Sequence, residues 1–427
     1  MRTSDAVMKR VCVLGLGYIG LPTACLIATQ GYQVIGVDTN DKVVARVNRG
    51  EVPFKEPELE ELLQKSLQSG KLTAKTEPDV ADVFLIAVPT SLDAKTKTAD
   101  LGYVRQAANS FAHYLRRGNL VIVESTVSPG TSERVVLPIL ESSGLKGGKD
   151  FYLAHCPERA IPGNTIYEMT NNDRIIGAMD GKSAEMAKKL YGSFVKGQIY
   201  GTDLRTAEII KLMENTHRDI NIALANEFAK IAEESAVDIW EAIDLANRHP
   251  RVNILKPGPG VGGHCLAIDP WFLTEHSAKS RIIGVARDIN DSMPYHVLDL
   301  VKQLIEGTKD ANITVLGVAY KGNVSDTRET PALRFIELAK KQGYKVKLHD
   351  PWVERFDYEL CSLDEAVRGS NCLVLITDHR QFRQLDPQRI ASLMKDRNLV
   401  DTRNFLGHQK WQEAGFKLRV LGNGRDL

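Results

Sequence analysis

The sequence predicts an α/β protein in which two doubly wound lobes are joined by a central helical part. Three observations lead to this prediction. Apolar, strand-like runs alternate with helical patterns over residues 11–195, and the same alternation returns after about residue 307. Between them, residues 206–235 carry no glycine or proline and repeat apolar residues at helical spacing. Alternating strands and helices are typical of a parallel sheet with helices on both faces.

Length and composition agree with several domains. A chain of 427 residues is long for a single hydrophobic core, so two or three domains are expected. We place them at residues 1–200, 201–305 and 306–427. The chain is 43% hydrophobic and 26% charged, which is typical of a globular enzyme. Its net charge of +1 offers no basic surface for nucleic acid or for a membrane, so we expect neither as a partner.

The cysteines and the first residues indicate a reducing compartment. The six cysteines show no CxxC spacing, which argues against a disulfide framework and against a bound metal. Residues 1–10 are polar, so we expect no secretory signal, and no apolar run approaches the roughly 20 residues that span a bilayer. We therefore expect a cytoplasmic protein. The cysteines are Cys12, Cys25, Cys156, Cys265, Cys361 and Cys372.

The first lobe opens with a strand, a glycine-rich turn, a helix and a second strand. Apolar runs at 10–14 and 33–37 predict the two strands, and residues 21–31 predict the helix between them. The turn has the sequence Gly-Leu-Gly-Tyr-Ile-Gly over residues 15–20. Because the turn leaves a strand and opens a helix, it predicts a Rossmann-like dinucleotide site rather than a structural turn alone.

The residue types of that turn suit a dinucleotide. Gly15 permits the tight turn, Gly17 lets the backbone approach a pyrophosphate, and Gly20 allows the helix to pack closely on the strand. The diphosphate would rest on the helix N-terminus, where N–H groups and the dipole favour anions. Asp38 ends the second strand, where a carboxylate can bind both ribose hydroxyls and would repel a 2′-phosphate. NAD is therefore the predicted cofactor. Its further predicted contacts in the turn are Tyr18 and Ile19.

Two later strands of this lobe end in segments that are expected to touch the cofactor. In an open parallel sheet, ligands bind beyond the carboxyl ends of the strands. The segments Val-Pro-Thr and Glu-Ser-Thr both follow apolar strands, which places Pro89, Thr90 and Thr126 at that edge. The remaining predicted elements of the lobe are strands at 83–88, 120–124, 151–155 and 174–177 and helices at 56–69 and 103–116.

The central part is expected to contain one long helix at 206–235 and a second at 239–247. A long helix in the middle of a two-lobed chain can join the lobes and form a dimer face, and its apolar residues can equally be plain core. Lys211 and Asn215 lie four apart and hence on one face. From spacing alone, Lys211 can also be an ordinary solvated charge, and Glu214 and Arg218 an ordinary surface pair.

The second lobe lacks a GxGxxG turn, so it need not bind a dinucleotide. Its alternation of apolar runs and helical patterns nevertheless matches that of the first lobe. The predicted strands are at 312–318, 345–349, 372–377 and 398–402, and the predicted helices are at 331–341 and 363–367.

One cysteine stands apart from the other five. Cys265 ends the glycine-rich run Pro-Gly-Pro-Gly-Val-Gly-Gly-His-Cys, and Asp269 follows four residues later. Glycine has no Cβ, which would let a substrate approach the sulfur, and an exposed thiolate can hold a carbonyl carbon covalently. Together with a nicotinamide site, this predicts an alcohol oxidised through an aldehyde to an acid. His264 can lower the thiol pKa, although neighbouring side chains often point apart.

Seven motifs, in their order along the chain, resemble those of the UDP-glucose/GDP-mannose dehydrogenase family over nearly the whole chain. The motifs are GLGYIGLPTA, VPT, EST, CPER, the KxxEN helix, GGHCLAID and YKGNVSDTRETPA. The segments RDINIA, ANRHPRVN and GVGGHCLAIDPWF resemble most closely the branch that oxidises UDP-N-acetyl-D-mannosamine. The resemblance implies a four-electron NAD enzyme that makes a uronic acid from a nucleotide sugar, with the third lobe holding uridine diphosphate.

The resemblance also implies roles for single residues. Cys265 resembles the nucleophile that forms a thiohemiacetal and then a thioester. Lys211 and Asn215 resemble the groups that steady the oxyanion, and Asp269 the carboxylate that works with Lys211 on base and water chemistry. Hydrolysis of a thioester needs a cation or amide near the oxyanion and a carboxylate near the water, so these residue types suit the chemistry.

Further positions match water-ordering, substrate and cofactor contacts of the family. Thr126 and Glu158 resemble residues that order water and assist proton transfer, although Thr126 can simply end a strand and Glu158 can pair with Arg159. Arg328 matches a cofactor contact. Arg251 matches a substrate contact that can reach a neighbouring subunit, and the family implies a homodimer through the long helix. The substrate contacts expected in all are Glu158, Arg159, Lys211, Asn215, Arg251, Gly262 and Lys321.

Three alternatives stay open at this point. The substrate can be UDP-N-acetylglucosamine or UDP-glucose, because no single residue of the sequence decides the C2 epimer. A two-electron dehydrogenase with Lys211 as its acid/base group is a second reading, but it leaves Cys265 unexplained. A protein that senses NAD without catalysis is a third, and the complete set of reactive residues argues against it.

Overall fold

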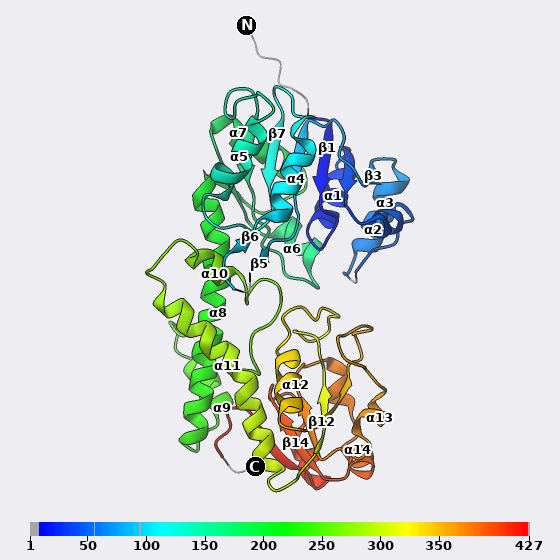
Figure 1. Ribbon diagram of the computed structural model, residues 1–427, viewed down its shortest axis with the longest axis vertical. Helices are drawn as coiled ribbons and strands as arrows, with labels where there is room; N and C mark the ends of the chain where they lie inside the picture. Colours follow the sequence, from blue (N-terminus) through cyan, green and yellow to red (C-terminus); the bar gives the residue numbers. More distant parts are fainter. Residues whose placement is uncertain (1–7, 55, 94, 426–427) are drawn as a thin grey trace. The chain divides into compact units, whose positions relative to one another are not determined.

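The computed structural model describes residues 8–54, 56–93 and 95–425. The chain folds into two compact units, and many of their elements are labelled in Figure 1. Unit 1 consists of the chain up to Glu214 together with Trp271–Ser277. Unit 2 consists of Asn215–Pro270 together with the chain from Ala278 onward. The predicted α/β class is confirmed in both units.

Unit 1 is built on an eight-stranded sheet with the order β10-β9-β8-β7-β4-β1-β2-β3. Neighbouring strands run parallel except for β8 and β9, so β9 and β10 run opposite to the other six. A two-stranded antiparallel hairpin, β5 and β6, lies outside this sheet. The strands are β1 (Arg10–Leu14), β2 (Gln33–Val37), β3 (Leu72–Lys75), β4 (Val83–Ile86), β5 (Ser91–Leu92), β6 (Ala99–Asp100), β7 (Leu120–Val123), β8 (Tyr152–His155), β9 (Arg174–Ala178) and β10 (Ile199–Asp203).

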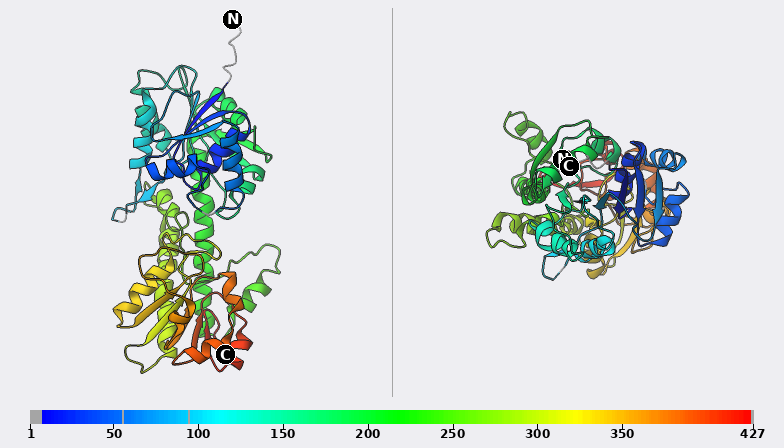
Figure 2. Two further views of the ribbon diagram at one scale, coloured as in Figure 1. Left: turned by 90° about the vertical axis from the view of Figure 1, so that its right-hand side faces the viewer. Right: turned by 90° about the horizontal axis from the view of Figure 1, so that it is seen from above.

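Helices cover both faces of this sheet, as the left view of Figure 2 shows around the blue strands. One apolar core lies under α1, α3 and α7, and a second lies under α4 and α5. The central strands are continuous apolar runs because both of their faces are buried. The helices are α1 (Gly20–Thr29), α2 (Asp41–Asn48), α3 (Leu59–Gln68), α4 (Gly102–Ala112), the π-helix η1 (Ser132–Val136), α5 (Leu137–Glu141), α6 (Thr165–Asn171) and α7 (Gly181–Tyr191).

The long helix predicted at 206–235 is α8 (Leu204–Glu234), and the second predicted helix is α9 (Ile239–Ala246). The residues of α8 up to Glu214 belong to unit 1 and the rest to unit 2. The short helix α10 (Asp269–Thr274) is likewise divided after Pro270. A further long helix, α11 (Arg281–Leu304), was not predicted, because Pro294 lies in its interior and proline usually ends a helix.

The second lobe, within unit 2, carries a five-stranded parallel sheet with the order β12-β11-β13-β14-β15. One continuous apolar core contains its strands together with residues of α9, α11 and α12. The strands are β11 (Asn312–Leu316), β12 (Lys345–His349), β13 (Cys372–Leu375), β14 (Asn398–Asp401) and β15 (Lys417–Val420). The helices are α12 (Pro331–Lys341), α13 (Leu363–Val367), the 3-10 helix η2 (Arg380–Gln384), α14 (Pro387–Leu393) and α15 (His408–Glu413).

In the part of the chain that the structure describes, none of the helices has the length and apolar composition to cross a membrane. Both sheets have a topological switch point, where the chain continues on the other side of its first strand. In unit 1 this point lies between β1 and β4, and in the second lobe it lies between β11 and β13. The carboxyl ends of these strand pairs are where ligands bind in open α/β sheets.

Candidate active site

The glycine turn of unit 1 lies between β1 and α1, at the switch point of the sheet. Gly15 has a φ of 96°, and a Cβ there would lie 2.4 Å from the Ala87 carbonyl oxygen. A Cβ on Gly20 would lie 1.9 Å from the Gly15 carbonyl oxygen. A Cβ on Gly17, by contrast, would meet nothing within 4 Å. Two glycines are therefore required by packing, and the third leaves open space above the N-terminus of α1.

Asp38 follows β2 and faces this turn. One carboxylate oxygen accepts the Leu16 N–H at 3.1 Å, and the other accepts the Asn40 N–H at 2.9 Å. A carboxylate has about four acceptor positions, so Asp38 can still accept hydrogen bonds from ribose hydroxyls. The helix N-terminus, the space over Gly17 and the acceptor capacity of Asp38 together fit the diphosphate and ribose of NAD.

The segments that follow β4 and β7 are tied to each other beside the turn. The Thr90 hydroxyl donates to the Thr126 carbonyl oxygen at 2.7 Å, and the Ser125 hydroxyl donates to the Val88 carbonyl oxygen at 2.7 Å. Tyr18 of the glycine turn stacks on Phe54, with ring centroids 4.1 Å apart. The structure thus places Pro89, Thr90 and Thr126 on two cross-linked loops at the carboxyl edge of the sheet.

The second lobe has the same arrangement of a glycine after its first strand and an aspartate after its second, but all acceptor positions of this aspartate are already used within the protein. Gly317 follows β11 with a φ of 87°, and Asp350 follows β12 where Asp38 follows β2. Asp350 accepts the N–H groups of Val318, Ala319, Trp352 and Val353, and it also pairs with His379 at 3.0 Å. Both side chains of the pair are fully buried. No acceptor position is left for ribose, which explains physically why this lobe need not bind a dinucleotide.

Cys265 is exposed, and it lies on a turn that leads into α10. The glycines before it do not leave space for a substrate, as the sequence suggested, because protein atoms fill that space. A Cβ on Gly262 would lie 2.5 Å from the Glu329 carbonyl oxygen, and a Cβ on Gly263 would lie 2.9 Å from the Tyr320 ring. Gly263 has a φ of 86° and donates its N–H to the Arg328 carbonyl oxygen at 3.0 Å. The glycines are needed for packing, and they hold the loop that presents the thiol.

Unit 2 brings Cys265, Asp269 and Asn215 together. The Cys265 carbonyl oxygen accepts the Asp269 N–H at 2.8 Å, so the carboxylate lies one helical turn after the thiol. The Asn215 amide donates to the Asp269 carboxylate at 2.5 Å, and Asp269 is 3% exposed. Lys211 lies one turn before Asn215 on α8, is largely buried, and belongs to unit 1. Of the predicted reactive residues, Asn215, Cys265 and Asp269 thus lie together within unit 2.

His264 does not supply a positive charge to the thiol. Burial lowers its pKa below the ordinary value, and the guanidinium of Arg328 lowers it further. The imidazole is therefore neutral near pH 7, and it cannot stabilise a thiolate as an imidazolium ion would. The lowered pKa of His264 therefore does not support activation of Cys265 by a positive charge on His264.

Glu158 and Arg159 have different partners from those suggested by their proximity. The Glu158 carboxylate accepts the N–H groups of Arg159 and Ala160 and pairs with Arg174 at 2.7 Å. The Arg159 guanidinium instead pairs with Glu214 of α8 at 2.6 Å. The alternative side-chain pairs Glu158–Arg159 and Glu214–Arg218 are therefore not the ones formed. Glu158 is buried and held by one cation.

Arg328, Lys321 and Arg251 lie in unit 2. The Arg328 guanidinium forms three hydrogen bonds to the Asp326 carboxylate, at 2.6, 3.0 and 3.1 Å, and the Arg328 carbonyl oxygen accepts the Gly263 N–H of the cysteine loop. Lys321 is exposed on the same segment, and Arg251 is exposed after α9. Arg328 therefore has a structural contact with the loop of Cys265, which the sequence did not indicate.

Sequence reasoning missed a carboxylate that ties α8 to the loop after β7. Glu208 lies three residues before Lys211 and is 1% exposed. It accepts the backbone N–H groups of Gly130 and Ser132, the latter at 2.8 Å. Within unit 1, it thereby connects the helix of Lys211 to the loop that begins near Thr126. An acidic residue in the apolar pattern of a helix is a weak indication, because most such residues face solvent.

A buried polar chain in unit 2 was also missed, and it holds the start of the cysteine loop. Asn226 of α8 accepts the Gly258 N–H at 2.8 Å and donates to Asn290 of α11 at 2.9 Å. Asn290 donates to Asp219 at 2.8 Å, and Asp219 accepts from the Arg287 guanidinium at 2.6 Å. All four side chains are buried, so the loop has one favoured position.

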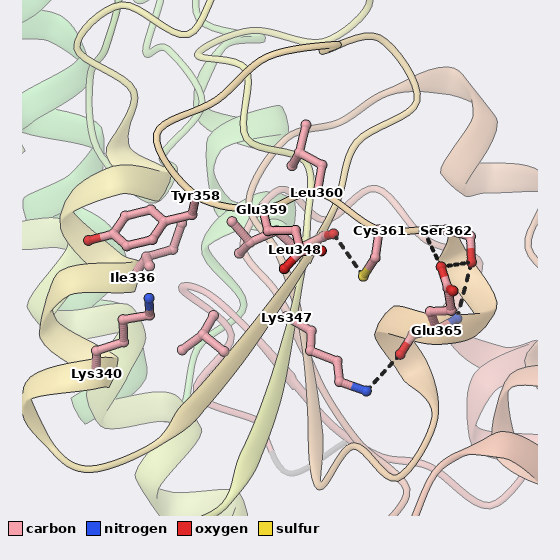
Figure 3. A pocket seen from close by; sticks show the side chains of 11 residues that line it. Ile336, Lys340, Lys347, Leu348, Tyr358, Glu359, Leu360, Cys361, Ser362 and Glu365 are labelled. Atoms are coloured by element: carbon pink, nitrogen blue, oxygen red, sulfur yellow. Dashed lines mark hydrogen bonds between the residues drawn. The ribbon is translucent and has the colours of Figure 1, made fainter.

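A cavity of about 610 Å³ lies elsewhere in unit 2, beside β12 and α12 (Figure 3). Its two amino groups are already engaged. Lys347 donates to the main-chain oxygen of Glu365 at 2.8 Å, and the Lys340 amino group lies 3.9 Å from the centre of the Tyr358 ring. The lining residues, all in the described part of the chain, include none of those predicted for the site. We therefore do not assign this cavity to the candidate site.

Models of the UDP-glucose/GDP-mannose dehydrogenase family match three stretches of the chain. The NAD binding domain matches residues 9–195, the central domain residues 205–292 and the UDP binding domain residues 314–408. The match to an NAD binding domain confirms the predicted cofactor.

Named relatives are similar over nearly the whole length. The chain is 48% identical to the UDP-N-acetyl-D-mannosamine dehydrogenase of Methanocaldococcus jannaschii, covering 99% of this chain and 98% of that protein. It is 43% identical to the NDP-N-acetyl-D-galactosaminuronic acid dehydrogenase of Ralstonia nicotianae, covering 94% and 97%. The solved structure of UDP-D-ManNAc dehydrogenase from Pyrococcus horikoshii matches with a TM-score of 0.93 at 43% identity, covering 98% of this chain and 100% of that one.

Proposed function

Because the chain belongs to the UDP-glucose/GDP-mannose dehydrogenase family, we propose that it oxidises the C6 alcohol of a UDP-sugar to the acid in two NAD-dependent steps. The proposed substrate is UDP-N-acetyl-D-mannosamine, and the product is the corresponding uronate. One observation carries the proposal. An exposed thiol, Cys265, lies one helical turn before a buried carboxylate, Asp269, which Asn215 holds in place.

The proposed chemistry removes four electrons and keeps the intermediate bound. NAD, when bound, supplies the hydride acceptor for both oxidations. The first oxidation produces an aldehyde, and the Cys265 thiolate adds to its carbonyl carbon to form a thiohemiacetal. That carbon again carries both a hydroxyl and a hydrogen, so the second oxidation removes the hydrogen as hydride and produces a thioester, which water cleaves to the acid and the thiol. One alcohol, two NAD⁺ and one water thus yield one carboxylate, two NADH and three protons.

The residues around the thiol have the chemistry that these steps require. Lys211 and Asn215 stand one turn apart on α8, and in the proposal the ammonium and the amide stabilise the oxyanion of the thiohemiacetal and of the hydrolysis step. The Asp269 carboxylate, with Lys211, accepts and returns the protons of the alcohol and of water. Thr126 and Glu158 assist by ordering that water. Glu158 suits this role because it is kept ionised by Arg174.

The substrate contacts belong to the proposal as well. Arg159, Arg251, Gly262 and Lys321 are proposed to hold the sugar nucleotide, and Arg328 to contact the cofactor. Arg159, Lys321 and Arg328 carry charges that suit phosphate groups. The UDP binding domain that matches residues 314–408 supports a uridine diphosphate in the second lobe. The domain division at residues 1–200, 201–305 and 306–427 and a cytoplasmic location remain predictions.

The function is tested by incubating the purified protein with NAD and a panel of nucleotide sugars. We expect UDP-N-acetyl-D-mannosamine to be consumed fastest and to release two NADH per sugar, because the thioester route oxidises the same carbon twice. NADH is followed by absorbance and the uronate by mass spectrometry. A ratio of one NADH per sugar would show a two-electron enzyme. Faster turnover of UDP-N-acetylglucosamine or UDP-glucose would overturn the substrate and keep the chemistry.

The role of the thiol is tested with Cys265→Ser and the control Cys361→Ser. Cys361 is the better control, because it is partly exposed, whereas the buried Cys156 contacts Arg174. We expect Cys265→Ser to lose formation of the acid, by about a thousandfold or more, and Cys361→Ser to retain it. Intact-protein mass spectrometry during turnover should show a sugar adduct on the wild type. Full conversion to acid by Cys265→Ser would contradict the proposal.

A homodimer through α8 is also part of the proposal. Leu224 and Ile231 are 40% and 52% exposed, and they lie seven residues apart on the unit 2 part of this helix. Residues at this spacing share a helix face, and exposed aliphatic side chains on one face are typical of a protein contact. The plain-core interpretation does not apply to these two positions, since both side chains are exposed within the chain.

A further inference from the structure

A cluster of buried charges lies beneath the carboxyl edge of the sheet in unit 1. Glu124 directly follows β7, Glu158 follows β8, and Arg174 is the first residue of β9. Their exposed fractions are 2%, 8% and 5%. Burying three charged side chains costs folding free energy unless each has a partner. The partners of each side chain therefore indicate what the cluster does.

One guanidinium serves both carboxylates. Arg174 donates to Glu158 at 2.7 Å through one terminal nitrogen. Its other terminal nitrogen lies 3.5 Å from Glu124 and 3.5 Å from the Cys156 sulfur. The pair with Glu158 therefore has ideal length for a charge-assisted hydrogen bond, and the pair with Glu124 is longer and weaker.

Glu124 is held on its other side by neutral donors. The Tyr191 hydroxyl of α7 donates to one carboxylate oxygen at 2.9 Å, and the Thr23 hydroxyl of α1 donates to the other at 3.1 Å. Tyr191 also faces the guanidinium, whose carbon lies 4.6 Å from the ring centre. Glu124 thus links the helix of the cofactor turn to the cation that holds Glu158.

The two carboxylates differ in ionisation because they share one cation unequally. Burial raises the pKa of Glu124 to about 7, and Arg174 offsets this only in part. Burial also works against ionisation of Glu158, but Arg174 and the two backbone N–H groups outweigh it and hold the pKa of Glu158 below its ordinary value. Near pH 7, Glu124 therefore exchanges its proton while Glu158 stays ionised.

We propose that Arg174 is a positioning residue that orients Glu158 and keeps it ionised, and that Glu124 modulates this hold by competing for the same guanidinium. The inference rests on the proposed function, in which Glu158 assists proton transfer. When Glu124 is protonated and uncharged, the Arg174 guanidinium forms an ion pair with Glu158 alone. When Glu124 loses its proton as the pH rises through about 7, a second negative charge draws on Arg174 and raises the proton affinity of Glu158.

The groups that face Glu124 come from four elements. Arg174 approaches from β9, Tyr191 from α7 and Thr23 from α1, while Glu158 and Cys156 approach from the segment after β8. The pKa values of Cys156 and Tyr191 are raised by burial, so both are uncharged near pH 7. Glu124 is therefore the group of this cluster that changes charge in the physiological range.

The first experiment uses Glu124→Gln, which keeps the shape and removes the charge change. In the protein without substrate, infrared spectroscopy of the wild type should show the C=O band of a buried carboxylic acid that fades with a midpoint near pH 7, and Glu124→Gln should lack that band. With substrate, the kcat profile of the wild type should bend near pH 7, and that bend should be absent in the variant. A band that persists in Glu124→Gln, or superimposable kcat profiles, would overturn the proposal.

The second experiment tests Arg174 with a conservative variant. Arg174→Lys keeps the charge and loses the two-pronged geometry, so we expect kcat to fall about tenfold or more, KM for NAD and sugar to change little, and the acid limb of kcat/KM to move up by about one pH unit. A merely structural role would lower the melting temperature without moving that limb. An unchanged limb and kcat in Arg174→Lys would refute the positioning role.

A harsher variant, Arg174→Gln, leaves two buried carboxylates without a cation and is expected to unfold readily. Adding Glu124→Gln removes one of them, so the double variant should regain folding, with the acid limb still displaced. Failure of the wild type to make NADH with any nucleotide sugar would instead reject the proposed function. The infrared titration of Glu124 does not depend on turnover, so the two failures are distinguishable.

Discussion

At the residue scale, surroundings separate six cysteines of identical chemistry. Burial raises the pKa of Cys12 and Cys25 to about 12 and that of Cys156 to about 11, and it raises the pKa of Cys372 as well. These four thiols stay protonated at neutral pH and are closed to substrate. Cys265 is the exposed one, and its loop leads to Asp269. To act as a nucleophile, a thiol must be accessible to the substrate and must be able to lose its proton.

Asp38 is the residue on which the cofactor choice depends. Asp38→Ala should raise the Kd for NAD about tenfold or more, because hydrogen bonds to a charged acceptor are worth about 1.5–3 kcal/mol. Affinity for the sugar nucleotide should be unchanged. Isothermal titration calorimetry measures both. Asp41→Ala is the control, since Asp41 is exposed at the start of α2. Equal loss of both affinities in Asp38→Ala would mean that the fold was damaged.

At the element scale, the loop of residues 257–264 is defined by what packs against it. The glycines of the loop pack so closely that a Cβ on them would collide with neighbouring atoms, and Asn226 accepts a hydrogen bond that fixes the start of the loop. The neighbours are Arg403, Pro331, Tyr320 and the Glu329 carbonyl group. A loop whose backbone is so closely packed cannot shift without moving its neighbours. The thiol is therefore presented by a rigid loop, which favours a defined attack geometry.

Gly263→Ala tests this rigidity. The alanine would need a φ of 86° and would place its Cβ 2.9 Å from Tyr320, so we expect a loss of about 2 kcal/mol or more in stability and a changed rate of Cys265 alkylation. Thermal unfolding and iodoacetamide labelling with mass spectrometry measure the two effects.

The matched control is Gly284→Ala in α11, where a Cβ would meet nothing within 4 Å. Alanine is the better helix former by about 1 kcal/mol, so this variant should be as stable as the wild type or more stable. It should also alkylate at the wild-type rate. Equal behaviour of the two variants would show that the packing around Gly263 does not control the thiol.

At the scale of the whole molecule, the exposed face of α8 predicts self-association. Ile231→Lys should shift the protein from dimer to monomer, measured by size-exclusion chromatography with light scattering. In a two-fold symmetric contact each substitution occurs twice, so one lysine introduces two charges at the interface. Tyr103→Lys is the control, because Tyr103 is 53% exposed on α4 of unit 1. A wild type that is monomeric, or an Ile231→Lys variant that stays dimeric, would rule out this face.

Much of the architecture was predictable because periodic patterns are local. The long helix was placed within two residues of Leu204–Glu234, and strands β1, β2 and β12 were placed at their observed bounds. Strands β3, β10 and β15 were missed, because each carries exposed or polar residues and lacks a continuous apolar run. The reversal at β9 was also missed, since strand patterns contain no direction.

The sequence by itself determined the α/β class, the family and the NAD cofactor, and it predicts Cys265 as the reactive thiol, because these depend on residue types at fixed spacing. Only the tertiary structure decided which partners the polar residues have. In the structure, the Glu158 carboxylate pairs with Arg174 and not with the Arg159 side chain, and the Asp350 carboxylate pairs with His379. The glycines before Cys265 are needed for close packing of the loop. Side-chain pairing depends on groups far apart in the chain, and burial sets its strength, so local patterns cannot contain it.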